Sequence, residues 1–314
     1  MMELHVILSP DIPALPVRTY LRQTQHISNS QWRRIKNSGT FRLNGEAVNL
    51  TQSTVHTGDI LTFESEKHES PIEPQDLPLD IRYEDAALLV IHKPAGQVVH
   101  PLRPEPTGTV GNAVLGYYRR TEQVHGFHPV HRLDRMTTGL VLIAKEPQVQ
   151  HQLTKKGLKA FHREYLALIR GHLEPPAGTI DLPIGFAPDS FIRHMVTDTG
   201  KPARTHYETV RTGIFRNESF MGELSLLHLR LDTGRTHQIR VHLAHLGHPL
   251  LGDDLYGGDM GLIDRQALHA CSLTFIHPMT GETIHIADPV PNDMQQIIDG
   301  LCDIPFFLDA AEKS

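Results

Sequence analysis

Cysteine is scarce in this chain of 314 residues, and no long hydrophobic run occurs. Two cysteines, Cys271 and Cys302, are too few for a disulfide framework and suit a reducing compartment, which predicts a cytoplasmic protein. No stretch approaches the roughly 20 apolar residues of a membrane helix. The opening MMELHVILSPDIP lacks the basic and apolar segments of a secretory signal. We therefore expect no membrane partner, and the length predicts about two domains.

Acidic residues are absent between Asp11 and Glu46, although the net charge of the whole chain is −6. Electrostatic attraction acts over about a Debye length, roughly 8 Å at physiological salt, so a local basic patch can attract phosphate despite an acidic total. The basic residues of this stretch are Arg18, Arg22, Arg33, Arg34, Lys36 and Arg42.

The first part of the chain reads as a small module over residues 12–66. The pattern predicts two helices, at 15–25 and 28–39, followed by a hairpin. The hairpin is predicted from Asn44-Gly45, the strongest short-range hairpin signal. Residues 67–80 continue an acidic, proline-rich stretch without periodicity, which is typical of a linker.

Residues 81–305 show a different pattern, in which short apolar or alternating runs predict strands. One helix is expected from about Arg235 to Leu246, with Ile239, Leu243 and Leu246 facing the core and Gly247 ending it. Strands and helices do not alternate regularly, so the fold class is predicted as α+β, with a mixed, mostly antiparallel sheet. The strand runs are 85–96, 139–145, 164–171, 203–210, 223–234 and 272–278, and further helices are predicted at 146–161 and 294–303.

The run HPVHRLDRMTTGLVLIAK, residues 128–145, holds a carboxylate in a turn that leads into an apolar strand. An aspartate before a strand usually makes only a local hydrogen bond to the backbone. Asp134, however, shares its turn with His131, Arg132 and Arg135, which would keep it ionised. An ionised carboxylate held at the edge of a sheet can act as a nucleophile.

A second run, GRTHQIRVHLAHLGHPLLGDDLYGG at 234–258, supplies cations. Arg235 and Arg240 could simply solvate a helix surface. A cation in the first helical turn is disfavoured by the helix dipole, so Arg235 is expected to have an anionic partner. We therefore predict an ion pair between Arg235 and Asp134.

Four histidines of the same run could suggest a metal site. No glutamate stands at the spacing found in zinc proteases, so no metal is predicted and hydrogen-bonding roles are expected instead. Tyr165 begins an apolar strand, where it could be structural or could stack on a base. The histidines are His237, His242, His245 and His248.

The ordered motifs over residues 80–280 closely resemble those of the RluA-type pseudouridine synthases. HRLDRMTTG resembles the family's active-site motif, with Thr137-Thr138-Gly139 replacing its usual Thr-Ser-Gly. Four further motifs occur in the expected order: LVIHKPAGQVVHP, FHREYLALIRG, TGRTHQIRVHLAHLGHPLLGDDLYGG and RQALHACSLTFIHP. The first module resembles, more loosely, the alpha-L RNA-binding domain attached to many of these synthases.

The resemblance implies the roles of individual residues. Asp134 would be the catalytic nucleophile, Tyr165 would pack on the flipped uracil, and Arg235 would be the partner of the aspartate. Arg132 would enter the RNA stack that the target uridine has left. An isomerisation oxidises and hydrolyses nothing, so no cofactor is expected. Further RNA-binding candidates are His131, Arg240, Arg33, Arg34 and Lys36.

The expected partner is structured RNA, most of all large-subunit ribosomal RNA, with transfer RNA as the other target class. An appended RNA-binding module favours a ribosomal target, because a second basic surface can grip a helix away from the flipped base. A monomer is expected. Two alternatives come from other classes: a non-catalytic RNA-binding or ribosome-assembly protein of the same fold, and a metal-dependent hydrolase built on the histidines.

Overall fold

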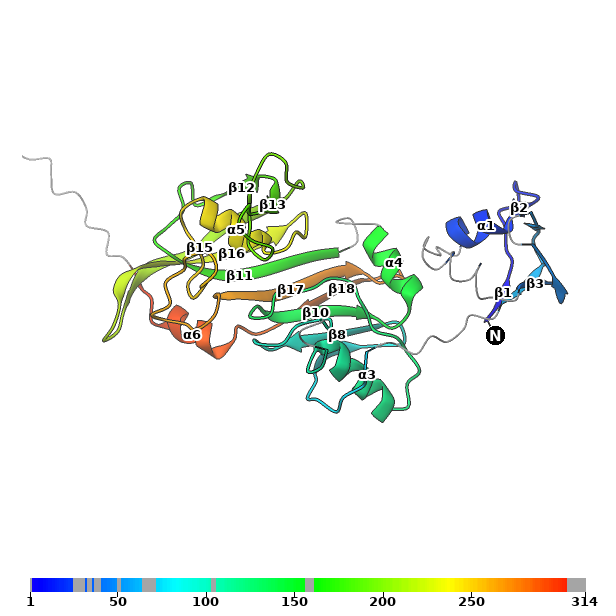
Figure 1. Ribbon diagram of the computed structural model, residues 1–314, viewed down its shortest axis with the longest axis horizontal. Coiled ribbons are helices and arrows are strands. Elements are labelled where there is room, and N and C mark those ends of the chain that lie inside the picture. Colours follow the sequence, from blue (N-terminus) through cyan, green and yellow to red (C-terminus); the bar gives the residue numbers. More distant parts are fainter. Residues whose placement is uncertain are drawn as a thin grey trace, which may run out of the picture.

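The computed structural model describes residues 2–24, 32, 36, 41–49, 52–63, 72–102, 106–155 and 161–303. These residues form two units with separate hydrophobic cores, the smaller at the N-terminal end (Figure 1). Within the described part of the chain, no helix is long and apolar enough to cross a membrane.

The small unit is built around a four-stranded sheet in the order β1-β6-β3-β4. Because β1 pairs with β6, this unit begins before the predicted boundary at residue 12. Tyr20 and Leu21 are buried in the core of this unit. Most of the predicted helix at 28–39 lies outside the described residues. The elements are β1 (Met2–His5), β2 (Leu15–Pro16), α1 (Val17–Thr19), the π-helical turn η1 (Tyr20–Thr24), β3 (Phe41–Leu43), β4 (Glu46–Ala47), β5 (Thr54–Val55) and β6 (Ile60–Phe63).

The predicted Asn44-Gly45 turn is confirmed and joins β3 to β4. Both residues have positive φ, 52° and 86°, as a type I′ turn requires. The side chain of Asn44 accepts a hydrogen bond from the Ile60 amide and donates one to Asp59, each at 2.8 Å. The turn is thereby tied to the neighbouring β6.

The large unit contains an eleven-stranded sheet whose main order is β12-β15-β16-β11-β17-β10-β8-β7. All pairs are antiparallel except β10 with β17, so the predicted α+β class with a mostly antiparallel sheet is confirmed. The sheet strands are β7 (Asp80–Glu84), β8 (Leu88–Lys93), β9 (His128–Pro129), β10 (Thr138–Ala144), β11 (Phe161–Arg170), β12 (Ala177–Asp181), β15 (Arg204–Arg216), β16 (Met221–Leu231), β17 (Leu268–Ile276), β18 (Thr283–Ala287) and β19 (Cys302–Asp303). A separate hairpin consists of β13 (Ile184–Phe186) and β14 (His194–Val196).

Alternate residues of the central strands pack into different cores. Val141 and Ile143 of β10 face a core that includes both α3 (Val110–Arg120) and α5 (Gln238–His245). Leu140 and Leu142 face the other side, where α4 (Pro147–Lys155) packs. Two helices, α3 and α5, therefore share one face of the sheet, at opposite ends of its strand order (Figure 1).

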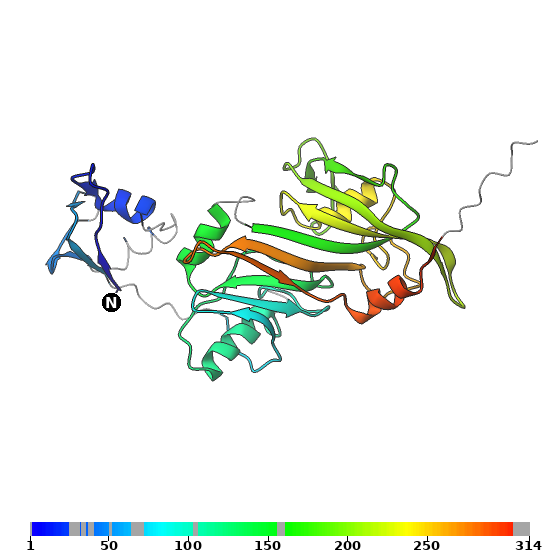
Figure 2. The same ribbon diagram turned by 180° about the vertical axis from the view of Figure 1, so that it is seen from behind.

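The opposite face of the sheet is covered at β11 and β16 by α6 (Asn292–Asp299). Seen from behind, α6 lies beside the long β15–β16 hairpin (Figure 2). Arg211 of β15 donates hydrogen bonds to the carbonyl groups of Ile298 and Leu301, which fixes this end of the chain on the sheet.

The predicted helix at 235–246 is partly wrong. It begins at Gln238, because the preceding His237 has a left-handed backbone with φ 55° and stands as the N-cap. Ile239 and Leu243 are buried as expected, but Leu246 is 40% exposed at the helix end. Arg235 therefore lies in the loop before the helix.

Candidate active site

Asp134 lies in the turn formed by residues 131–137, between β9 and β10. The Thr137 amide donates to the Asp134 carbonyl at 3.1 Å, and the Gly96 amide donates to the Arg135 carbonyl at 3.0 Å. From Thr138 onward, β10 is buried along its whole length. The Asp134 side chain is 25% exposed, so its carboxylate is anchored but can be reached from outside.

Lys93, at the end of β8, holds this turn in place through hydrogen bonds. Its side chain is fully buried, and its ammonium group donates to three carbonyl oxygens, those of Pro94, Gln97 and Arg135. Burial lowers the pKa of Lys93 to about 7, an effect that the nearby Asp134 carboxylate opposes. The three bonds join the loop after β8 to the Asp134 turn.

Gly139 allows the chain to pass directly from the turn into β10, an inner strand of the sheet. Its φ is +111°, and a Cβ atom there would lie 2.3 Å from the Ala270 carbonyl oxygen. This close approach occurs where β10 and β17 run parallel, with Gly139 opposite Ala270. A residue with a side chain would force the two strands apart.

Arg240 is the cation that contacts Asp134. Its Nη1 donates to Asp134 Oδ2 at 3.2 Å, while Nε and Nη2 donate to the two oxygens of Asp253 at 2.7 and 2.8 Å. Arg240 is 6% exposed and Asp253 fully buried. Burial lowers the pKa of Arg240, but the hydrogen bonds and negative charges of Asp253 and Asp134 together outweigh burial and raise the pKa above its ordinary value. One carboxylate therefore orients the guanidinium toward the other.

The predicted ion pair between Arg235 and Asp134 is not present. Arg235 is exposed, and its Nε donates to the Pro202 carbonyl at 2.9 Å. The reason is the late helix start: Arg235 precedes α5, whereas Arg240 lies within it and its side chain is directed at the turn.

His237 and Tyr256 complete the polar surroundings of Asp134. His237 Nε2 lies 3.9 Å from Asp134 Oδ2, and its Nδ1 lies 3.0 Å from the Tyr256 hydroxyl. Burial lowers the pKa of His237 even though Asp134 raises it, so the ring is neutral at pH 7. The Arg240 guanidinium lies 5.0 Å from the centre of the Tyr256 ring.

Tyr165 lies on β11, between Leu229 of β16 and Ala270 of β17. It is 4% exposed and belongs to the core shared by α3 and α5. Burial raises the pKa of its hydroxyl, and the negative charge of Asp134 adds to the effect. Tyr165 is therefore a neutral aromatic group in the same core as Leu133, the residue before Asp134.

The family model described as RNA pseudouridylate synthase matches residues 87–245, which include the Asp134 turn, Tyr165 and Arg240. This chain belongs to the RNA pseudouridylate synthase family. It is an isomerase that acts on RNA, as the sequence motifs predict. The family match ends with α5, so Asp253 and Tyr256 lie beyond it.

Curated relatives extend the similarity over most of the chain. The "Uncharacterized RNA pseudouridine synthase YjbO" of Bacillus subtilis is 39% identical over 83% of this chain and 90% of its own. "Ribosomal large subunit pseudouridine synthase D" of Escherichia coli K12 is 40% identical over 82% of this chain and 81% of its own. The solved structure "Human RNA Pseudouridylate Synthase Domain Containing 1" has a TM-score of 0.54 at 26% identity, covering 71% of this chain and 86% of that one.

His131 is placed differently from its predicted role in RNA binding. It is 8% exposed, and its Nε2 accepts a hydrogen bond from the Leu142 amide at 3.1 Å. Burial, together with the charge of Arg163, lowers the pKa of His131 to about 3. A neutral, buried ring cannot offer a charge to phosphate. The prediction did not foresee that the ring accepts a hydrogen bond from the backbone of β10.

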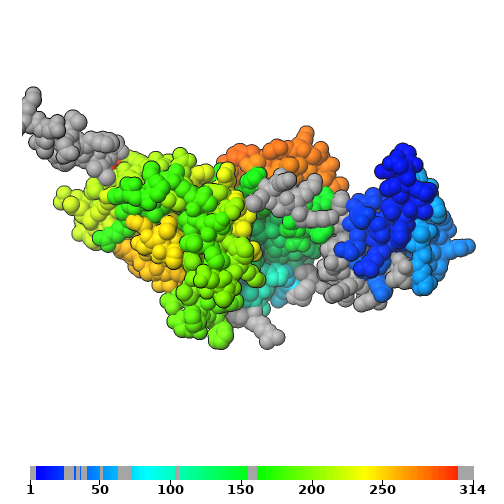
Figure 3. All heavy atoms as spheres, turned by 90° about the horizontal axis from the view of Figure 1, so that it is seen from above, coloured from blue at the N-terminus to red at the C-terminus, as the bar shows by residue number. Residues whose placement is uncertain are grey.

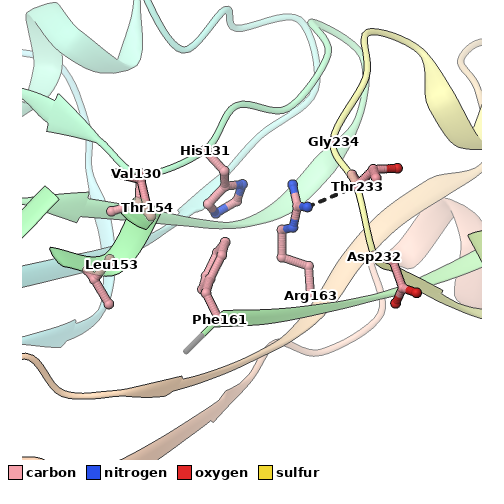
Figure 4. Close-up of a pocket in the computed structure, with 9 residues that line it drawn as sticks. All are labelled: Val130, His131, Leu153, Thr154, Phe161, Arg163, Asp232, Thr233 and Gly234. Atoms are coloured by element: carbon pink, nitrogen blue, oxygen red, sulfur yellow. Dashed lines mark hydrogen bonds between the residues drawn. The ribbon is translucent and has the colours of Figure 1, made fainter. Parts of the chain in front are cut away.

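Beside His131 lies a pocket of about 190 Å³, in which the ring faces Phe161 and Arg163 of β11 (Figure 4). Arg163 donates to the Thr233 carbonyl at 3.2 Å, and a Cβ atom at Gly234 would lie 2.9 Å from its guanidinium. Because Gly234 has no side chain, it leaves room for the guanidinium of Arg163.

The other predicted RNA contacts divide into three groups. Arg132 is exposed on the Asp134 turn, and Lys36 is exposed in the small unit. Arg33 and Arg34 lie outside the described residues. Arg240 is paired with two carboxylates, so it positions Asp134 and is not a free cation for phosphate.

Sequence reasoning missed Lys93, Asp253 and Tyr256. Asp253 stands in the quoted run GRTHQIRVHLAHLGHPLLGDDLYGG, but only the fold brings it to Arg240. Lys93 also lies in a quoted motif, and a lysine inside an apolar strand is the signal that could have marked it. Among the described residues, no group of three histidine, cysteine, aspartate or glutamate side chains is arranged to hold a metal ion.

Proposed function

We propose that this synthase converts uridine to pseudouridine in large-subunit ribosomal RNA, with Asp134 as the nucleophile. The observation that carries the proposal is the carboxylate of Asp134, a quarter exposed and held by Arg240, which Asp253 orients. Curated relatives about 40% identical are named for large-subunit ribosomal RNA, which supports this target above transfer RNA.

In the proposed reaction, the target uridine is flipped out of the stack at a cost of a few kcal/mol. Asp134 forms a transient covalent adduct with the ribose or the uracil, and the bond between the base and the sugar breaks. The uracil turns and rejoins the sugar through carbon 5, and the bond to Asp134 breaks, which restores the free carboxylate. Carbon 5 loses its proton, and nitrogen 1 of the uracil takes up a proton. Nothing is gained or lost overall, so the reaction is an isomerisation.

The neighbouring side chains have supporting roles in this proposal. Tyr165 contacts the flipped uracil with the small part of its neutral aromatic ring that remains accessible. Arg132, exposed on the same turn, fills the gap in the stack, since a guanidinium both stacks and pairs with phosphate. Arg240, in place of Arg235, holds the Asp134 carboxylate in position for the substrate.

The N-terminal unit, with the linker after it, is proposed to be an alpha-L-type RNA-binding module. Arg18, Lys36 and Arg42 are exposed there, within a stretch that has no acidic residue from position 12 to position 45. Replacing these three residues with glutamine should weaken RNA binding and make it less dependent on salt, by about one unit of log–log slope per lost phosphate contact.

The experiment that tests the target is a reaction of the purified protein with unmodified large-subunit ribosomal RNA and with unmodified total transfer RNA. Pseudouridine is then mapped by position in both. The proposal predicts modification at defined positions of the ribosomal RNA. Modification of transfer RNA alone would overturn the target but leave the chemistry standing.

A further inference from the structure

The β13–β14 hairpin exposes aromatic and aliphatic side chains close to the candidate active site. Phe191, in the loop between the strands, is 99% exposed, Ile192 is 69% exposed, and Phe186 is 64% exposed. Exposed large apolar groups that lie close together in a loop commonly mark a binding surface. The base of the hairpin is anchored, since Ile184 is buried with Val241 of α5.

This loop is held by its own hydrogen bonds. The Ser190 hydroxyl accepts from the amides of Ile192 and Arg193, and the Ala187 amide donates to the Arg193 carbonyl. Arg193 also holds Asp189 through two bonds of about 3 Å. Phe191 is therefore presented on an organised turn, which reduces the entropy that binding would lose.

A series of rings joins this hairpin to Asp134. The ring of Phe186 packs on His194, with centroids 4.5 Å apart, and His194 meets His237 at 5.6 Å. His237 in turn lies 3.9 Å from Asp134. The His194 amide also donates to the Tyr256 hydroxyl at 3.0 Å. These contacts connect the hairpin to the site. Figure 1 shows β13 beside α5, and Figure 3 shows green segments of this part of the chain next to the yellow segments around α5.

Exposed cations lie at the base of the hairpin. Lys201 pairs through its backbone with Ile184 of β13, and its side chain is exposed. Arg235 is also exposed and bonds to the Pro202 carbonyl, next to Lys201. Aromatic rings beside cations are the combination that binds single-stranded nucleic acid, because bases stack while phosphates are neutralised.

We propose that the β13–β14 hairpin is a stacking platform for an unpaired nucleotide next to the target uridine. Phe186 and Phe191 stack on its base, and Lys201 and Arg235 neutralise the adjoining phosphates. This inference rests on the proposed function, because it places the target uridine at Asp134. It also gives Arg235 a role outside the pair with Asp134.

The test is a single-turnover assay with a ribosomal RNA fragment that contains a site modified by the wild-type protein. The Phe186→Ala/Phe191→Ala variant should bind this RNA about tenfold or more weakly, with little change in the rate at saturation. Phe191→Tyr should retain binding, and Phe191→Leu should not. Met221→Ala is the matched control, since Met221 is 71% exposed at the start of β16.

A second RNA series locates the contact by replacing each nucleotide next to the target with an abasic one. One replacement should weaken binding by the wild type about tenfold and should not weaken the double variant further. Equal RNA binding by wild type and double variant would overturn the platform while leaving the catalytic proposal intact. If the double variant binds RNA like the wild type and differs only in self-association, measured by sedimentation, the surface would be an interface with a second copy of the chain. That result would also overturn the platform. If the wild type modifies no ribosomal RNA, the proposed function itself fails.

Discussion

Arg240 donates to Asp134 at 3.2 Å while the rest of its guanidinium is held by the buried Asp253. The two carboxylates share one cation, but only Asp134 is open to the outside. The planar fork of arginine is what makes this possible, because its donors point in fixed directions toward both acids. In this account, Asp253 sets the direction of Arg240, and Arg240 sets the position of Asp134.

Arg240→Lys is predicted to lower the rate of pseudouridine formation about 100-fold, because lysine keeps the charge but cannot hold both acids. Arg235→Lys is the matched control and should leave the rate at saturating RNA unchanged. Single-turnover rates at saturating RNA measure both. Equal losses in the two variants would contradict the assignment of Arg240 as the partner of Asp134.

Asp253→Asn is predicted to reduce the rate about 10- to 100-fold, as commonly seen when the group that orients a catalytic neighbour is changed. The amide keeps the shape of the side chain but offers only one oxygen to Arg240. Circular dichroism should show a folded protein, so the loss can be assigned to positioning. An unchanged rate in a folded variant would show that Arg240 does not need Asp253.

His131 is predicted to make the folded protein sensitive to acid. The pKa of His131 is about 3 in the folded protein and near 6.5 in the unfolded chain. Between these values the unfolded chain binds a proton at this residue and the folded protein does not, so acid favours unfolding. The contribution of neutral His131 to the free energy of unfolding is complete above pH 6.5 and is lost as the pH falls toward 3. At pH 5 the loss is about 2 kcal/mol.

The measurement for His131 is urea unfolding at pH 7 and pH 5. His131→Gln retains an acceptor for the Leu142 amide but does not titrate, so it should lose less stability between the two pH values than the wild type. The other buried histidines remain in both proteins and cancel in this comparison. Identical losses would show that His131 is not the group responsible.

Gly139→Ala is predicted to destabilise the large unit by several kcal/mol, because its Cβ would lie 2.3 Å from the Ala270 carbonyl oxygen. Gly96→Ala is the control: φ is +84° and nothing lies within 4 Å, so only backbone strain of about 1–2 kcal/mol is expected. Thermal unfolding distinguishes the two. Similar losses would mean that β10 can move away from β17 without difficulty.

Much of the sheet could be predicted because its signals are local. Apolar runs such as GLVLIAK fill buried strands, and Asn44-Gly45 supplies the positive φ values of its turn. The parallel pairing of β10 with β17 could not be predicted, since residues 131 positions apart meet there, Thr138 with His269 and Gly139 with Ala270. The Arg235 error has a similar cause, because a left-handed His237 moves the start of α5 and no propensity rule foresees it.

The candidate site was predicted where a motif and a short-range neighbour sufficed. Asp134 follows from the cations and the strand around it. Tyr165 was expected at the start of an apolar strand, but it lies within β11, which begins at Phe161. The role of His131 depends on a hydrogen bond to Leu142 of β10, which the spacing of residues does not show. Arg240 could be listed as a candidate site residue, but its role as the partner of Asp134 could not be predicted, because its two acidic partners come from two other loops.

The most direct measurement is pseudouridine mapping of ribosomal RNA from cells lacking this protein, complemented with the wild type or with Asp134→Ala. The account predicts that at least one position in large-subunit RNA loses pseudouridine, regains it with the wild type and stays uridine with the variant. Restoration by an Asp134→Ala protein present at the wild-type level would contradict the central claim that this carboxylate performs the reaction.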